Sequence, residues 1–211
     1  MIADIAAAIV RVRASLSDSG TSKLQRGENL LKPNGTQTIF LLANFNVVSG
    51  SVYVTQDASV RSQSGFTMDY PNGIITFTVA PVSTLTKFYV DYNYYFATDT
   101  EYTEFVNQAL SYLGIAAVSD VPLGLEAALI EYAKYAFYTK RATEYANRYN
   151  SSGGIAGHQV ESVTKNYLSL ATTAFKMAAD LRNDYYERKG KRAAPASGSF
   201  NYNIDPYTPP R

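Results

Sequence analysis

Two long segments with helical periodicity, residues 121–149 and 158–188, occupy most of the second half of this 211-residue chain. In both segments small or apolar residues recur at alternating intervals of three and four positions, the spacing of a helix with one packed face. The first seam consists of Leu125, Ala128, Tyr132, Tyr135, Thr139, Ala142, Ala146 and Tyr149, and the second of Val160, Val163, Tyr167, Leu170, Ala174, Met177 and Leu181. The link between the segments, residues 150–157, is short and rich in glycine. The sequence therefore predicts an antiparallel helical hairpin packed along these seams.

The predicted hairpin is long for a chain of this size. At the α-helical rise per residue, each helix spans about 40 Å. We therefore expect part of each helix to pack against a neighbouring subunit.

Two shorter helices are predicted upstream of the hairpin. Residues 3–16 place four apolar residues on one stripe, namely Ile5, Ile9, Val12 and Leu16. A further helix begins after Thr98, because Thr98 and Glu101 have the spacing of a capping box, in which each side chain accepts from the other residue's backbone amide. Gly114 suits the left-handed position that ends many helices.

Residues 36–97 have the pattern of β-strands, with short runs of β-branched and aromatic residues. In residues 66–78 two alternating runs flank Asn72-Gly73, a dipeptide that adopts positive φ at low cost, so this segment predicts a hairpin. Further strands are expected near residues 38–42, 51–55 and 86–96. Roughly five strands in about 60 residues predict a small antiparallel β-sandwich or barrel.

The predicted fold class is α+β, a helical bundle with an inserted β domain and an extended C-terminal arm. Residues 1–35 would form an N-terminal helix and a linker, and residues 36–97 the β domain. Residues 98–190 would form the helical bundle, and residues 191–211 the arm.

Composition excludes several kinds of site. The sequence has no cysteine, so disulfides, zinc thiolates and thiol nucleophiles are ruled out, and folding in a reducing cytoplasm is the natural interpretation. The net charge is +1, too small for the whole chain to attract nucleic acid or an acidic membrane. No apolar run is long enough to span a membrane, and the first residues lack the basic region of a secretory signal.

Tyrosine is abundant, with 18 Tyr and 10 Phe but no Trp. A tyrosine ring with a polar tip suits a surface that is wet before assembly and buried after it. The alternative is that most of these rings fill strands and helix seams within the chain.

The sequence gives little support for catalysis. Its one histidine, His158, lies where a helix is expected to begin, a position typical of a surface residue, and no metal-ligand spacing accompanies it. Gly153, Gly154 and Gly157 lack the Lys-Ser or Lys-Thr that follows in a phosphate loop, so a helix link explains them better. No carboxylate pair stands out, although sequence alone leaves glycosidase-type pairing open. We expect no enzymatic activity, no cofactor and no metal.

Basic residues gather near the end of the last predicted helix: Arg182, Arg188, Lys189, Lys191 and Arg192. Cations at this position are favoured by the helix dipole, which explains them without a ligand. The alternative is that they contact DNA phosphates or an acidic partner surface.

The C-terminal segment alternates aromatic and apolar residues with polar ones and is punctuated by proline. Its apolar positions are Phe200, Tyr202, Ile204 and Tyr207. This pattern favours an arm that becomes ordered on a partner, by strand addition for example. A frayed terminus is the alternative.

The order of these elements resembles the head-to-tail connector (adaptor) proteins of tailed bacteriophages. The resemblance is carried by residues 94–110, an acidic capped helix that follows the opening element, then by the long helical hairpin and the extended tail. Residues 66–77, FTMDYPNGIITF, also look like modules of phage structural proteins. The β insertion is larger than in the simplest adaptors.

The resemblance implies a virion protein of the neck, between capsid and tail, assembled in the host cytoplasm. Its subunits would form a ring, a dodecamer in that family, that docks on the portal protein through the C-terminal arm. The ring would contact a downstream neck or tail protein and extend the channel, touching DNA without sequence specificity and with no membrane involved. The alternatives are a head-closure or tail-completion protein, or a carbohydrate-binding β module, against which the absence of Trp counts.

Overall fold

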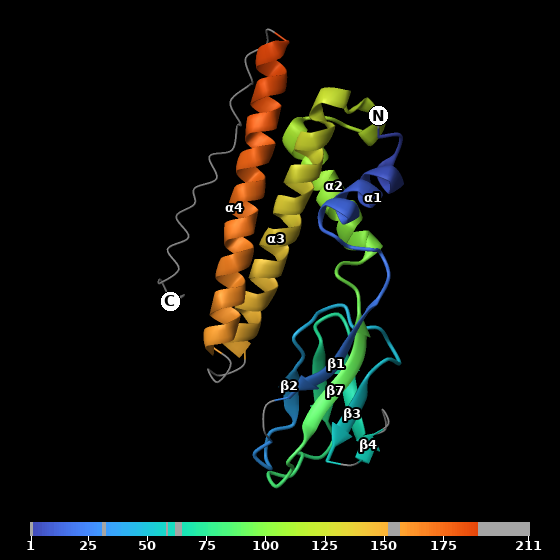
Figure 1. Cartoon of the computed structure of the whole chain (residues 1–211), viewed down its shortest axis with the longest axis vertical. Helices are drawn as coiled ribbons and strands as arrows, with labels where there is room; N and C mark the ends of the chain where they lie inside the picture. The colour runs from blue at the N-terminus through green and yellow to red at the C-terminus, as the bar shows by residue number, and fades with distance from the viewer. Residues whose placement is uncertain (1, 31–32, 58, 62–64, 152–156, 190–211) are drawn as a thin grey trace.

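The computed structural model describes residues 2–30, 33–57, 59–61, 65–151 and 157–189. These residues form a mixed α+β fold with four α-helices and two small antiparallel sheets. Figure 1 shows the helices gathered at one end of an elongated molecule and the strands at the other. The described strands stay in two separate sheets and do not close into a barrel, so the barrel alternative is wrong.

The two shorter helices form where the sequence predicts them. Helix α1 (Ile5–Ser15) begins after Asp4, whose side chain accepts from the Ala7 amide. Helix α2 (Asp99–Leu113) has the complete capping box between Thr98 and Glu101, and it ends at Gly114 with φ of 69°.

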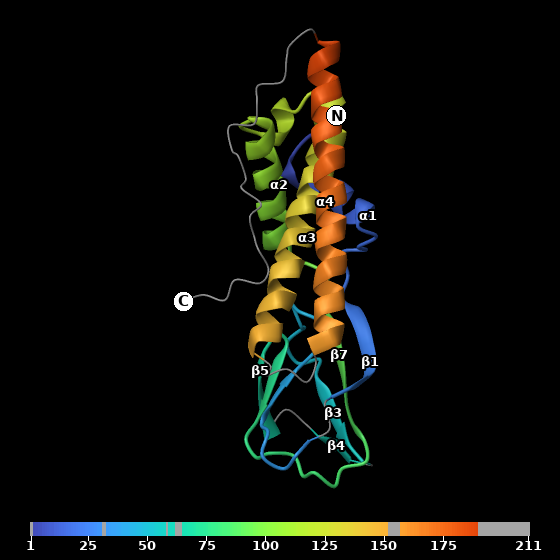
Figure 2. The ribbon, with the colours of Figure 1, turned by 90° about the vertical axis from the view of Figure 1, so that its left-hand side faces the viewer.

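The helical hairpin is also confirmed. Two short 3-10 turns, η2 (Val118–Asp120) and η3 (Leu123–Leu125), lead into α3 (Glu126–Ser151), and α4 (Gly157–Arg188) follows. Figures 1 and 2 show α3 and α4 side by side over most of their length, with α2 beside α3.

The first sheet has the strand order β1-β7-β3-β4, with β1 (Lys23–Asn29), β7 (Phe88–Tyr94), β3 (Tyr53–Gln56) and β4 (Ser59–Arg61). The second has the order β2-β6-β5, with β2 (Ile39–Leu41), β6 (Ile74–Phe77) and β5 (Phe66–Asp69). The inner faces of both sheets contribute to one apolar cluster, which includes Phe40, Val54, Ile75, Phe77 and Val90.

The predicted hairpin at Asn72-Gly73 is present as β5–β6, paired from Phe66 with Phe77 to Asp69 with Ile74. The four residues between the last pair make its turn, and Gly73 has the positive φ expected of it. Asp69 closes the turn, since its carboxylate accepts from the Asn72 side-chain amide at 2.8 Å.

The predicted linker boundary at residue 35 is wrong, because β1 lies within the segment expected to be a linker and pairs with β7. None of the residues in β1 is fully buried, and its register shifts between Gln25 and Glu28. An edge strand held by backbone hydrogen bonds rather than by an apolar face shows no period-two hydrophobic pattern, so its residues carry no signal of a strand.

The helices have a core separate from that of the strands. It joins Ala8 and Val12 of α1, Phe105 and Ala109 of α2, and the inner residues of α3, among them Leu129 and Phe137. No residue belongs to both apolar clusters. The chain thus folds into a helical body and a β body, with the β body inserted between α1 and α2.

Candidate interaction surface

Helix α4 carries apolar side chains that the described part of the chain leaves about half exposed. Leu168, Leu170 and Met177 are 49%, 47% and 46% exposed. Leu170 and Met177 are seven residues apart, so they share one flank of the helix, while Leu168 lies on another.

The exposure of Leu170 and Met177 corrects the seam predicted for this helix. The residues buried against α3 are small: Ala171, Ala174 and Ala178. Helix α3 presents large rings to α4, such as Tyr135, which lies 5.2 Å from Phe175 between ring centroids. Rings from both helices fill part of this contact and the alanines let the helices approach between them, so the larger Leu170 and Met177 lie beside the contact.

Many tyrosines lie between the helices. Tyr112 of α2 stacks on Tyr132 of α3 at 4.2 Å, and Tyr145 of α3 stacks on Tyr167 of α4 at 5.6 Å. Burial raises the pKa of Tyr132 and of Tyr167 above the ordinary value of a phenol. These rings therefore pack inside the chain, which supports the intramolecular explanation for them.

Tyr92 has an equally internal role in the β body. Its hydroxyl donates to Glu28 and accepts from the Asn44 side-chain amide at 2.9 Å. Burial, together with the Glu28 charge, raises the pKa of Tyr92, so the phenol stays protonated. In the same body, Tyr53 is more than half exposed.

The predicted basic cluster is divided by the structure. The Arg182 guanidinium lies 4.9 Å from the centre of the Tyr112 ring, and its Nε is enclosed, so Arg182 is a packing residue rather than a free surface cation. Arg188 pairs with Asp184 of the same helix at 2.9 Å and stays largely exposed. Lys189 is exposed. Lys191 and Arg192 lie outside the described residues.

A shallow depression of about 350 Å³ lies beside the end of α4. It is lined by Ile115, Asp120, Pro122, Leu125, Tyr185, Tyr186 and Lys189. Asp120 and Lys189 are the two charged residues of this lining, and the rest is apolar or aromatic. This lining suits contact with the surface of another protein better than catalysis, because it does not bring an acid and a base group together.

The described ranges hold no further site of a kind that binds metal or crosses a membrane. No group of three or more His, Asp or Glu residues among them is placed to hold a metal ion. Within the same ranges, no helix has a stretch long and apolar enough to cross a membrane. His158 falls in the first turn of α4, and its side chain is outside what the structure describes.

The four positions assigned to the partner-binding arm, Phe200, Tyr202, Ile204 and Tyr207, also lie outside the described residues. The arm therefore stays a prediction.

Two exposed apolar residues on the β body lie outside the sites that the sequence predicts. Val79 is 73% exposed and Val82 is 57% exposed, and both lie in the segment between β6 and β7. Their signal in the sequence is weak, because two valines around Pro81 look like a continuation of the preceding strand.

No protein-family model, curated protein or solved structure matches this chain.

Proposed function

We propose that the chain is a non-enzymatic structural subunit that works by assembling with other copies and with virion partners. The observation that carries this proposal is the pair Leu170 and Met177 on one flank of α4, each nearly half exposed on a 32-residue helix. Exposed apolar side chains on a helix flank lose contact with water when a second helix covers them.

The assembly that fits best is the head-to-tail connector of a tailed bacteriophage. In support, the described elements have the order expected from the resemblance: an opening helix, a β insertion, a capped helix and a long hairpin. Each copy would present the α4 flank to its neighbour in a ring, with a heterologous contact that closes by rotation. The two sheets, which share one core, would act as a small sandwich projecting from that ring.

In this proposal the C-terminal arm docks on the portal protein and the ring extends the DNA channel towards the tail. A net charge of +1 suits passage of DNA without tight binding. The exposed cationic groups at the end of α4, Arg188 and Lys189, would make non-specific contact with the phosphates. Localisation in the virion neck follows from the same proposal.

Co-sedimentation with a purified portal ring tests the proposal. We expect the full chain to sediment with the portal, and a chain truncated after Gly190 to lose this binding. The double variant Leu170→Asp/Met177→Asp should also fail to form a ring on the portal, while Val79→Asp, an exposed valine on the β body, should behave as the wild type. Equal binding by the truncated chain would refute the arm, and absence of any portal binding would refute the adaptor. Binding to a tail-side protein alone would favour a head-closure or tail-completion role.

A further inference from the structure

The helical body and the β body meet through a small polar and aromatic joint rather than through a shared core. The β body contributes residues 43–46, in the segment between β2 and β3. Phe45 is only 6% exposed, yet it belongs to neither apolar cluster. Its burial is therefore a property of the joint itself.

Residues 43–46 lie against helices α2 and α3. The Tyr145 hydroxyl of α3 donates to the Ala43 carbonyl at 2.9 Å. The Phe45 ring meets the Tyr145 ring edge to face, with centroids 5.0 Å apart. The Asn46 side-chain amide donates to Glu101 of α2 at 2.8 Å.

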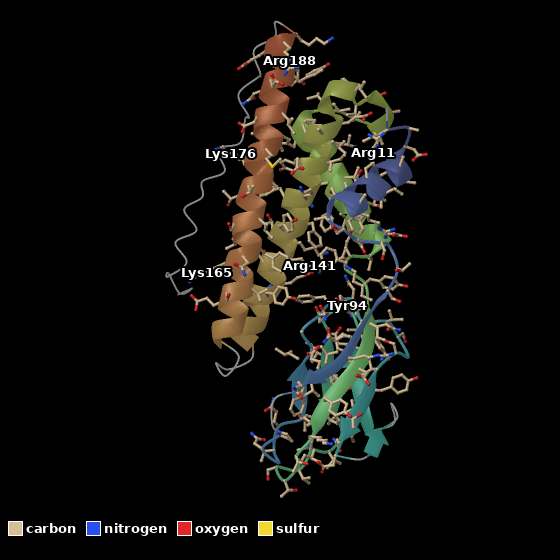
Figure 3. All side chains as sticks on the ribbon, viewed as in Figure 1. Arg11, Tyr94, Arg141, Lys165, Lys176 and Arg188 are labelled. Carbon is tan, nitrogen blue, oxygen red and sulfur yellow. The ribbon has the colours of Figure 1, made fainter. Side chains whose placement is uncertain are left out.

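Arg141 of α3 is the centre of the joint. It is 4% exposed, and its guanidinium lies 5.5 Å from the centre of the Phe45 ring. It donates to the Phe96 carbonyl, in the segment between β7 and α2, and to Glu144 of its own helix. Figure 3 labels Arg141 on α3 near the level where the two bodies meet, with Tyr94 of β7 close below it.

Glu101 of α2 lies beside Arg141 and, with Arg141 and Tyr145, forms the socket that holds residues 43–46. It accepts from the Thr98 amide as part of the α2 capping box and lies 3.0 Å from Lys140 and 3.7 Å from Arg141. The same carboxylate therefore caps a helix, holds the β body through Asn46, and balances two cations. A buried arginine that satisfies several acceptors at once fixes their mutual geometry, because its planar fork has few alternative arrangements.

We propose that the β body is a separately folded module, held in one orientation by a latch in which residues 43–46 sit in the socket formed by Glu101, Arg141 and Tyr145. The exposed parts of the two chain crossings between the bodies, residues 19–22 and Tyr95, act as the hinge. Opening the latch frees the β body to swing while both cores stay intact. A small interface of this kind permits domain motion, whereas a large apolar one would not. This inference is independent of the proposed role in a virion.

Two dye labels measure the orientation directly. The chain has no cysteine, so Thr84→Cys on the β body and Ala116→Cys on the helical body create unique sites, both exposed. Single-molecule energy transfer on the full chain should show one narrow population. Arg141→Met, which keeps the side-chain length but removes the charge and the donors, should abolish that single population and give a broad distribution. The matched control Arg188→Met, which breaks only an exposed pair with Asp184, should leave it unchanged.

Phe45→Ala opens the latch from the other side and leaves the Glu101 and Arg141 contacts with the helices in place. It should broaden the distribution as well. Amide exchange should show protection retained around Val54 of the β body and Leu129 of the helical body in both variants. A single narrow population in Phe45→Ala would overturn the latch. Loss of protection of the helical core in Arg141→Met would overturn it too, because Arg141 would then be a core residue and not a latch.

Discussion

Among the described glycines, Gly124 of η3 leaves the least room for a side chain. Whether its replacement by alanine destabilises or stabilises the protein should depend on Tyr185. A Cβ at this position would lie 2.6 Å from Cδ2 and 3.0 Å from Cε2 of Tyr185, near the end of α4. These ring atoms cannot move without the whole side chain, so Gly124→Ala overpacks the contact between η3 and α4. Overpacking of this kind costs about 1–3 kcal/mol.

An opposing effect acts through the unfolded chain. The backbone of Gly124 is outside the positive-φ region, so alanine fits its conformation, and loss of unfolded-state entropy then stabilises the protein by about 0.4–1 kcal/mol. We therefore expect Gly124→Ala to lower the free energy of unfolding of the helical body by roughly 0–2.6 kcal/mol, the difference of these two ranges. With Tyr185→Ala in the background the clash is gone, and the same substitution should instead stabilise by about 0.4–1 kcal/mol.

A double-mutant cycle measured by urea unfolding, followed by circular dichroism at a helix-sensitive wavelength, checks this change of sign. Gly114→Ala is the control, because it has φ of 69° and nothing within 4 Å, so its cost is backbone strain and should be equal in both backgrounds. The same sign for Gly124→Ala with and without the Tyr185 ring would refute the packing of η3 on α4.

Three further predictions concern the β body and the joint. Phe77→Ala should lower the free energy of unfolding by about 3–5 kcal/mol in urea titrations, because the ring is buried among other phenylalanines. Val79→Ala, at an exposed position, should change the free energy of unfolding by less than about 0.5 kcal/mol. Equal effects of the two substitutions would contradict the assigned core. Burial alone would raise the pKa of Glu101, but Arg141, the Thr98 amide and Lys140 hold this pKa below its ordinary value of 4.5. The ionised carboxylate therefore stabilises the fold above pH 4.5, and this stabilisation is lost as the pH falls through the lowered pKa. Glu101→Gln should flatten the acid limb of a curve of stability against pH, and an unchanged limb would refute the ion network. Tyr92→Phe should cost about 1–3 kcal/mol, measured by urea unfolding, because it leaves the Asn44 amide and Glu28 without their common partner, and no loss would show that water replaces the hydroxyl.

Local signals in the sequence located most helices and one hairpin. The Thr98 and Glu101 pair, Gly114 and Asn72-Gly73 each act through backbone geometry within a few residues, so the surrounding fold does not alter what they specify. The antiparallel hairpin of α3 and α4 also followed from a short link and two periodic segments.

Features set by the partner of an element could not be read from its own residues. Strand β1 forms because β7 offers it backbone hydrogen bonds, which leave no trace in its composition. The face of α4 that packs on α3 is determined by the tyrosines of α3. A row of alanines is buried there, and Leu170 and Met177 stay exposed although they are more apolar. The sequence predicts Arg182 in a basic cluster near the end of the last helix, but an aromatic ring far away in sequence, Tyr112, determines where it lies.

The buried state of Arg141 was the least visible feature of all. In the sequence it is one basic residue on a helix with polar neighbours, and arginine is mostly exposed in proteins. Only the meeting of Phe45, Phe96 and Glu101, from three separate segments, makes its position comprehensible.

The mass of the complex formed with a purified portal ring tests the central claim most directly. Native mass spectrometry or analytical ultracentrifugation of the full-length chain with the portal should give one species carrying a fixed, ring-forming number of copies, and Leu170→Asp/Met177→Asp should remove it while leaving the free chain folded. A chain that stays a free monomer in the presence of the portal, or a double variant that assembles as well as the wild type, would contradict the account.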